Sequence, residues 1–154
     1  MERIVREVVK QMKPATAMSL ELALKLMEKV EAEAERIGVK AVVAVSDAAG
    51  RPVAIHCTDG AFIGSFDVAL NKTYTSVAFQ MSTAKLAELA APGGSLYGIQ
   101  NTNEGKIVIF GGGEPLYIDD VLIGAIGVSG GTAEQDTYLG AYGKNILKEV
   151  VAWK

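Results

Sequence analysis

The sequence holds few of the side chains that most catalytic and metal sites require. Its 154 residues include one histidine and one cysteine, adjacent at His56 and Cys57, and aromatic residues make up 6%. A single cysteine excludes an internal disulfide framework and is typical of a reducing compartment. A single histidine excludes a multi-histidine metal site. No Ser-His-Asp set and no CxxC motif is evident either.

Excess charge of one sign and long apolar runs are also lacking. The net charge is -3 and acidic and basic residues are interleaved, so we expect no nucleic-acid partner. No apolar run reaches the roughly 18 residues of a membrane span, and no secretory apolar segment follows Met1. We therefore expect a cytoplasmic protein with no membrane partner. The composition, 49% hydrophobic and 21% charged, is typical of one globular domain.

Apolar periodicity predicts a mixed α/β (α+β) protein. Helices are expected over residues 1–13, 19–37, 64–79, 82–91 and 132–153, and strands over 39–47, 51–57, 106–110, 114–119 and 121–129. We expect Ser19 to cap the second helix, and the turns GGG and DD to separate the last three strands. Strands joined by short turns pair antiparallel, so we expect a five-stranded antiparallel sheet packed with helices. Because helices and strands do not alternate, a doubly wound nucleotide-binding fold is excluded.

Glycine is abundant, with 17 residues, and the stretch "GVSGGTAEQD" has the strand–glycine–helix order of a phosphate-binding loop. Thr132 and Gln135, however, fit a capping box, in which each side chain bonds the other residue's backbone N–H. Carboxylates in the first helical turn, including Asp136, favour the helix dipole and oppose a bound phosphate. We interpret Gly130-Gly131 as a strand-to-helix turn whose backbone could still contact a ligand.

Several blocks in a fixed order carry a family resemblance. They are DG-x-x-x-GS at residues 59–65, the lysine at Lys72, GGG-x-P at 111–115, and GVSGGT-x-x-QD. With these blocks the chain resembles the GlcG/HbpS-like haem-binding family, which includes the C-terminal domain of PduO cobalamin adenosyltransferases. The resemblance implies a profilin-like domain over residues 19–154, a homo-oligomer of dimer to octamer size, and haem or cobalamin as cofactor. Adenosyl transfer belongs to another domain of PduO and is not carried over.

His56 is the first candidate site residue, because a neutral imidazole can be a haem axial ligand. The alternative is a polar strand residue with no iron contact. Cys57, Tyr74, Met18 and Met81 are other potential iron ligands. Alternation along a strand places His56 and Cys57 on opposite sides of the sheet, so both are not expected to reach one metal.

Lys72 is the second candidate, since it could hold a haem propionate or another carboxylate as a compact charge. The alternative is a solvated helix lysine. Asp59, Ser65 and Thr73 lie near it in the sequence, with Asp59 also readable as a turn former and Ser65 as a helix cap. Glycine-rich segments and polar neighbours complete the predicted ligand-binding set: Gly112, Gly113, Glu114, Gly130, Gly131, Gln135 and Asp136.

The segment 1–13 carries an apolar stripe on one helical face, formed by Ile4, Val5, Val8, Val9 and Met12. It resembles the short encapsulation peptides that direct enzymes into bacterial microcompartments, which implies a shell protein as partner. The alternative is a helix at an oligomer interface.

These observations favour a non-catalytic accessory protein that binds haem or a corrinoid, with a setting in a bacterial microcompartment. Two alternatives stay open. One is an enzyme that acts on a small organic acid through Lys72 or His56. The other is a structural oligomer that organises other proteins.

Overall fold

The computed structural model of the chain describes residues 1–12 and 17–152, and the side chains of residues 9–12 lie outside that description. Its helices are α1 (Glu2–Met12), α2 (Leu20–Arg36), α3 (Ser65–Phe79), α4 (Thr83–Ala90) and α5 (Ala133–Ala152), with short 3-10 turns η1 (Ile99–Asn101) and η2 (Asn103–Gly105). Its strands are β1 (Val42–Asp47), β2 (Pro52–Cys57), β3 (Gly113–Ile118) and β4 (Val121–Ser129). The expected ends of the first helix at residue 13 and of the last at residue 153 lie outside the described residues.

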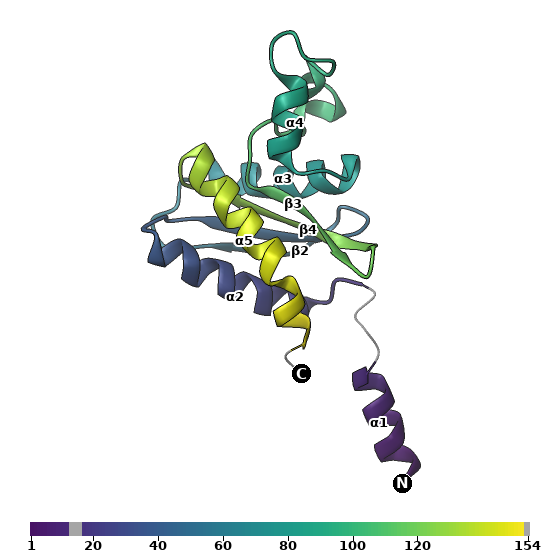
Figure 1. Cartoon of the computed structure of the whole chain (residues 1–154). Helices are drawn as coiled ribbons and strands as arrows, with labels where there is room; N and C mark the ends of the chain where they lie inside the picture. The colour runs from purple at the N-terminus through teal and green to yellow at the C-terminus, as the bar shows by residue number, and fades with distance from the viewer. Residues whose placement is uncertain (13–16, 153–154) are drawn as a thin grey trace.

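The strands form one antiparallel sheet in the order β2-β1-β4-β3. Helices α2 and α5 cover one face of this sheet and α3 covers the other, with α4 beyond α3 (Figure 1). The fold is therefore α+β, as the sequence predicts. Strands β2 and β3 are the edges; β2 is largely exposed or half-buried, whereas the first four residues of β3 are buried.

The two faces of the sheet differ in what they bury. The face under α2 and α5 holds the main apolar core, with Leu26, Val43, Ile126 and Leu139 all fully buried. The α3 face has a small apolar cluster of short side chains, and α3 itself buries polar residues, Lys72 among them. Polar groups sealed inside a protein need partners; Lys72 has them, whereas the buried Ser76 hydroxyl has none among the described residues.

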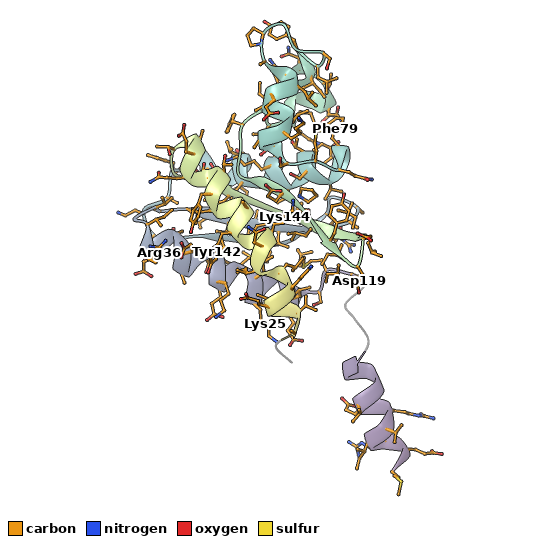
Figure 2. All side chains as sticks on the ribbon, viewed as in Figure 1. Lys25, Arg36, Phe79, Asp119, Tyr142 and Lys144 are labelled. Carbon is orange, nitrogen blue, oxygen red and sulfur yellow. The ribbon has the colours of Figure 1, made fainter. Side chains whose placement is uncertain are left out.

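A hydrogen-bonded link joins α2 to α5 on the outer side of the main core. Glu33 Oε1 accepts hydrogen bonds from the Tyr138 hydroxyl and from Arg36 Nη2, each at 2.6 Å. Figure 2 shows Arg36 at the C-terminal end of α2. The Arg36 guanidinium, followed by the Tyr138 hydroxyl, lowers the pKa of Glu33 to about 2. The carboxylate therefore stays charged over the whole physiological range.

The prediction of a fifth strand over 106–110 is wrong. Ile107 and Val108 are buried, as a strand would require, but the segment pairs with no strand of the described sheet. Instead, the Val108 N–H donates to the Thr75 hydroxyl of α3 at 3.0 Å. Apolar periodicity reports burial and not the identity of the hydrogen-bond partner, so it could not separate this extended segment from a strand.

Two other local predictions are confirmed. Ser19 caps α2, with its hydroxyl accepting from the Leu22 N–H at 3.0 Å. The β3–β4 hairpin turns at Asp119 and Asp120, whose φ angles of 48° and 64° fit a two-residue type I′ turn.

On α1, Ile4, Val5 and Val8 are exposed. None of the described helices is long and apolar enough to cross a membrane.

Candidate functional site

Lys72 lies on the side of α3 that faces the sheet, and its side chain is 0% exposed. Its Nζ donates to the Val128 carbonyl at 2.6 Å and lies 3.3 Å from Oδ2 of Asp136. The ring of Phe110 covers it, with the centroid 5.1 Å from Nζ. Burial lowers the pKa of Lys72, and Asp136 offsets part of that effect. Lys72 is therefore not a solvated lysine, and the carboxylate that it holds belongs to its own chain.

Asp136 is the other half of this cluster and is also buried. Its Oδ1 accepts from the Gly131 N–H at 2.9 Å and its Oδ2 accepts from the Gly130 N–H at 3.4 Å. The glycine turn is thus an anion cradle that an internal carboxylate already fills. We call these contacts of Lys72, Asp136, Gly130 and Gly131 the Lys72–Asp136 cluster.

Two glycines are required for the close packing of this cluster. Gly112 has φ +121°, and a Cβ there would lie 2.7 Å from Lys72 Nζ. Gly130 has φ +149°, and a Cβ there would collide with the Lys40 carbonyl. Both the backbone conformation and the space exclude larger residues at these positions. Gly112 leaves room for the Lys72 ammonium, and Gly130 lets the turn lie against the Lys40 backbone.

The capping box at the start of α5 is confirmed. The Thr132 N–H donates to Gln135 Oε1 at 2.9 Å, and the Gln135 N–H donates to Thr132 Oγ1 at 3.1 Å. The Gln135 side chain is thereby committed to its own helix start, as the sequence predicts. The backbone N–H groups of Thr132 and Gln135, which a phosphate at this helix start would need, are therefore already occupied.

Ser65 does not cap α3, so that prediction is wrong. The helix begins at Ser65 itself, Gly64 is the N-cap and no side chain bonds the first turn. The Ser65 hydroxyl instead accepts from the Ser129 hydroxyl at 3.2 Å. This contact ties the start of α3 to the end of β4, because a buried hydroxyl needs a partner.

Three further predicted site residues have partners inside the protein. The Thr73 hydroxyl donates to the Leu70 carbonyl of its own helix at 2.6 Å. The Gly113 N–H donates to Thr83 Oγ1 at 2.9 Å. Glu114 lies beside α5, where Lys144 Nζ is 3.6 Å from its Oε2, and Figure 2 shows Lys144 on that helix. Burial raises the pKa of Glu114, opposed by Lys144. The structure does not bring Glu114 into the Lys72–Asp136 cluster.

His56 lies at the exposed edge of the sheet, away from that cluster. It pairs with Val43 on β1, and its Nδ1 is 2.6 Å from Oε1 of Glu31 on α2. The His56 side chain is 45% exposed. Cys57 is exposed as well and pairs with Val42, whose side chain belongs to the α3 face. The prediction that His56 and Cys57 face opposite sides is confirmed.

A surface groove adjoins this pair. It has a volume of about 680 Å³ and runs between α2, the loop that joins α2 to β1, and the turn that follows β2. Glu31 lines it together with Glu28, Glu35 and Asp59, and Lys40 supplies a positive charge. We call it the α2–β2 groove. Glu31 belongs both to the groove and to the histidine pair, whereas His56 is not among the residues that line the groove.

Comparison with known proteins places the chain in a family. The family model described as "Haem degrading protein HbpS-like" matches residues 18–143. The chain belongs to the HbpS-like family. Among curated relatives, an uncharacterised 15.0 kDa protein from the dhaT-dhaS intergenic region of Citrobacter freundii is 45% identical over 121 residues, which cover 79% of this chain and 85% of that protein.

Other relatives of this HbpS-like chain include a longer enzyme and two solved structures. The corrinoid adenosyltransferase PduO of Salmonella typhimurium is 39% identical over 67% of this chain, and the match spans 31% of PduO. Klebsiella pneumoniae protein ORFY superposes with a TM-score of 0.83 at 37% identity, covering 88% of this chain and 94% of ORFY. The PduOC:heme complex superposes with a TM-score of 0.80 at 33% identity, covering 84% of this chain and 94% of PduOC.

Of the other potential iron ligands of this HbpS-like chain, Cys57 is exposed, whereas Met18, Tyr74 and Met81 are less accessible or are held by neighbours. Met18 is buried in the main core, and the Tyr74 hydroxyl accepts from Asn103 Nδ2 at 3.0 Å. Met81 is half-buried. Within residues 1–12 and 17–152, no group of three histidine, cysteine or acidic side chains could hold a metal ion. His56 would thus be the single protein ligand of a metal ion bound there, without further ligating side chains among the described residues.

Sequence reasoning missed Glu31, Lys40 and Phe110. Each owes its place to a contact between segments distant in the sequence, such as that between Glu31 and His56, which are 25 positions apart. In the sequence, Glu31 is one of several acidic residues on the polar side of an amphipathic helix. No pattern in the sequence singles it out.

Proposed function

We propose that this HbpS-like protein binds haem and that His56 supplies the axial ligand. The observation that carries the proposal is the 2.6 Å contact of His56 Nδ1 with Glu31 on an exposed edge strand. A metal-bound histidine commonly donates its other ring N–H to a carboxylate, so this arrangement fits an iron at Nε2. The likeness to the PduOC:heme complex at 33% identity supports the same ligand class.

His56 Nε2, on the exposed β2 edge, is the point at which we propose that the macrocycle attaches. The neighbouring α2–β2 groove does not take the ring, because four carboxylates line it against the single Lys40 ammonium and would repel the propionates. Lys72, the residue first considered for the propionate, has no part in this proposal because its ammonium is buried against Asp136.

The role that we propose is that of an accessory protein: it holds and orients the cofactor, whose iron supplies the redox chemistry when bound. A corrinoid is the second candidate, since its cobalt also accepts an imidazole ligand. The specific observation for it is the match to 31% of a corrinoid adenosyltransferase. We do not extend adenosyl transfer to this chain, which spans about a third of that enzyme.

A haemin titration followed by absorbance tests the proposal. We expect a saturable Soret shift near one haemin per chain, lost in His56→Ala because the axial nitrogen is gone. Cys57→Ala is the matched control, since it truncates the next residue on the opposite side of the sheet. Equal binding by His56→Ala and the unmodified chain would contradict the assignment. Hydroxocobalamin, titrated in parallel, should bind more weakly than haemin.

We further propose that residues 1–13 bind a microcompartment shell protein. The exposed stripe of Ile4, Val5 and Val8 supports this, because an amphipathic helix docks its apolar face in a partner's groove. Val5→Asp should abolish co-sedimentation with purified shells. Arg3→Gln changes the net charge by the same amount on the opposite helical face and should leave it intact. Equal recovery of both variants with the shells would refute targeting by this stripe.

We also propose that the protein is a homo-oligomer, between dimer and octamer in size. Phe62 and Ile63 are 74% and 94% exposed, and Phe66 adjoins them on α3. Contiguous exposed apolar side chains commonly mark an interface. Light scattering should give a smaller mass for Ile63→Asp than for the unmodified chain. An unchanged mass would exclude this surface as the interface.

A further inference from the structure

A second surface groove lies between the first half of α2 and the second half of α5. It has a volume of about 450 Å³ and is formed by Lys25 and Lys29 of α2 with Tyr142, Ile146 and Val150 of α5. We call it the α2–α5 groove, and Figure 2 shows Lys25 and Tyr142 on its two helices. We propose that α1 folds back and docks in this groove of its own chain, antiparallel to α2.

Both surfaces that would meet are apolar. Tyr142 and Ile146 are half-buried and pack against the main core from within the groove. On α1, Ile4, Val5 and Val8 are 69%, 54% and 46% exposed and lie on one side of the helix. In Figure 1, α1 stands clear of the sheet, so the structure presents the undocked arrangement. Docking is favourable because it removes the stripe and the groove from water together.

The connection between α1 and α2 is long enough for this reversal. Five residues separate the end of α1 at Met12 from Met18, which is buried in the main core. Five residues span at most about 16 to 18 Å. Lys25, where the groove begins on α2, lies five residues after Leu20, about 8 Å along the helix. The last turn of α1 can therefore lie beside the start of α2, which brings the apolar stripe over the groove.

The charges at the two borders of the stripe match the groove in the antiparallel orientation. The right-handed turn of the helix then places Glu7 towards α2 and Arg6 towards α5. On the α2 side Lys25 and Lys29 outnumber one acidic residue, and on the α5 side the charged residue is Glu149. A parallel orientation would exchange the borders and bring like charges together. Electrostatic complementarity of this kind fixes the register and direction of a contact.

The tether favours docking within one chain over docking on another molecule. A short flexible tether gives an effective concentration of about 1 mM, roughly 100-fold above that of the groove in a solution of about 10 µM protein. A docked stripe is covered, so a shell protein must displace α1 from the groove before it binds. This consequence rests on the proposed shell contact, whereas the docking itself does not.

Disulfide trapping in the full chain tests the docking. Arg6→Cys and Glu149→Cys are combined with Cys57→Ser, and a disulfide forms on mild oxidation if the two positions meet. Arg3→Cys with Glu149→Cys is the matched control, because Arg3 lies on the helical face opposite the stripe. We expect the pair with Arg6 to form a disulfide within one chain at least about tenfold faster than the pair with Arg3. Equal rates, or disulfides formed between chains, would overturn the proposal.

A charge reversal tests the orientation. With the Arg6 and Glu149 cysteine pair, Glu7→Lys should slow disulfide formation about two- to fivefold, the range that an exposed ion pair contributes. Lys25→Glu, added to Glu7→Lys, should restore the rate because the two charges attract again. Lys25 is 43% exposed, so its reversal leaves the core intact. A further loss of rate in the double reversal would contradict antiparallel docking.

Co-sedimentation with purified shells separates this inference from the proposed shell contact. Lys25→Glu alone should raise recovery with the shells about two- to fivefold, because α1 leaves the groove more often. Lys85→Glu, which reverses another exposed lysine, should leave recovery unchanged. Rapid disulfide formation at Arg6 without any recovery refutes the shell contact and leaves the docking standing. Recovery with equal disulfide rates at Arg3 and Arg6 refutes the docking and leaves the shell contact standing.

Discussion

Removing the charge of Lys72 should destabilise the protein far more than removing the charge of a surface lysine. Lys72 and Asp136 have side chains 0% and 6% exposed, with Nζ and Oδ2 3.3 Å apart. At an effective dielectric constant of about 20, their attraction is about 5 kcal/mol. Lys72→Met leaves the Asp136 carboxylate buried without its counter-charge. Breaking a buried pair in this way costs about 3–5 kcal/mol.

A double-mutant cycle measures the coupling between the two residues. Asp136→Asn should also cost about 3–5 kcal/mol, because it leaves a buried ammonium, while its amide oxygen can still accept from the glycine turn. The double variant, Lys72→Met with Asp136→Asn, has no unpaired charge. Its cost should be about 3 kcal/mol less than the sum of the two single costs, which is the size of coupling expected for residues in contact.

Urea unfolding followed by far-ultraviolet circular dichroism provides the free energies of unfolding. Lys85→Met is the matched control, since the Lys85–Glu88 pair at 3.0 Å is exposed on both sides. Its cost should stay within about 1 kcal/mol. Folded domains have about 5–15 kcal/mol of stability, so the single variants should still show a folded baseline. A cost for Lys72→Met equal to that of Lys85→Met, or strictly additive costs in the cycle, would refute the reasoning.

Two smaller perturbations test other contacts. Gly140→Ala would place a Cβ 2.7 Å from the Gly112 carbonyl, so α5 must shift and denaturation should show a loss of about 1–3 kcal/mol. Gly64→Ala, which meets no atom within 4 Å, should stay within about 0.5 kcal/mol. Glu33, with its pKa lowered to about 2 by Arg36, should make stability fall as pH drops from 4.5 towards 2, because the unfolded chain takes up the proton first. In Glu33→Gln, the melting temperature should depend less on pH over that range. An unchanged pH dependence of the melting temperature would contradict this.

The helices, the hairpins and the caps at Ser19 and Thr132 were predictable because their signals are local, whereas the cap expected at Ser65 was wrong. The hydroxyl of Ser19 and the reciprocal bonds of Thr132 and Gln135 depend on residues three positions apart. The strand expected over 106–110 was wrong for the opposite reason. Its hydrogen-bond partner, Thr75, lies 33 residues before Val108, and no local pattern identifies it.

The candidate site was predictable as a set of residues but not as an arrangement. Lys72, Asp136 and the glycines were all singled out in the sequence, yet the pair is separated by 64 residues. Sequence therefore left open whether the lysine would hold a ligand or an internal carboxylate. The partner of His56 was missed entirely, since Glu31 differs from its acidic neighbours only by what the fold places opposite it.

Resonance Raman spectroscopy of the haemin-reconstituted protein in the reduced state tests the central claim most directly. The chain has one histidine, so protein labelled with nitrogen-15 histidine carries the label only at His56. If His56 is the axial ligand, the iron–histidine stretch shifts to lower frequency on labelling, and the shift is absent in His56→Ala. A bound haem whose spectrum does not change on labelling would contradict the account.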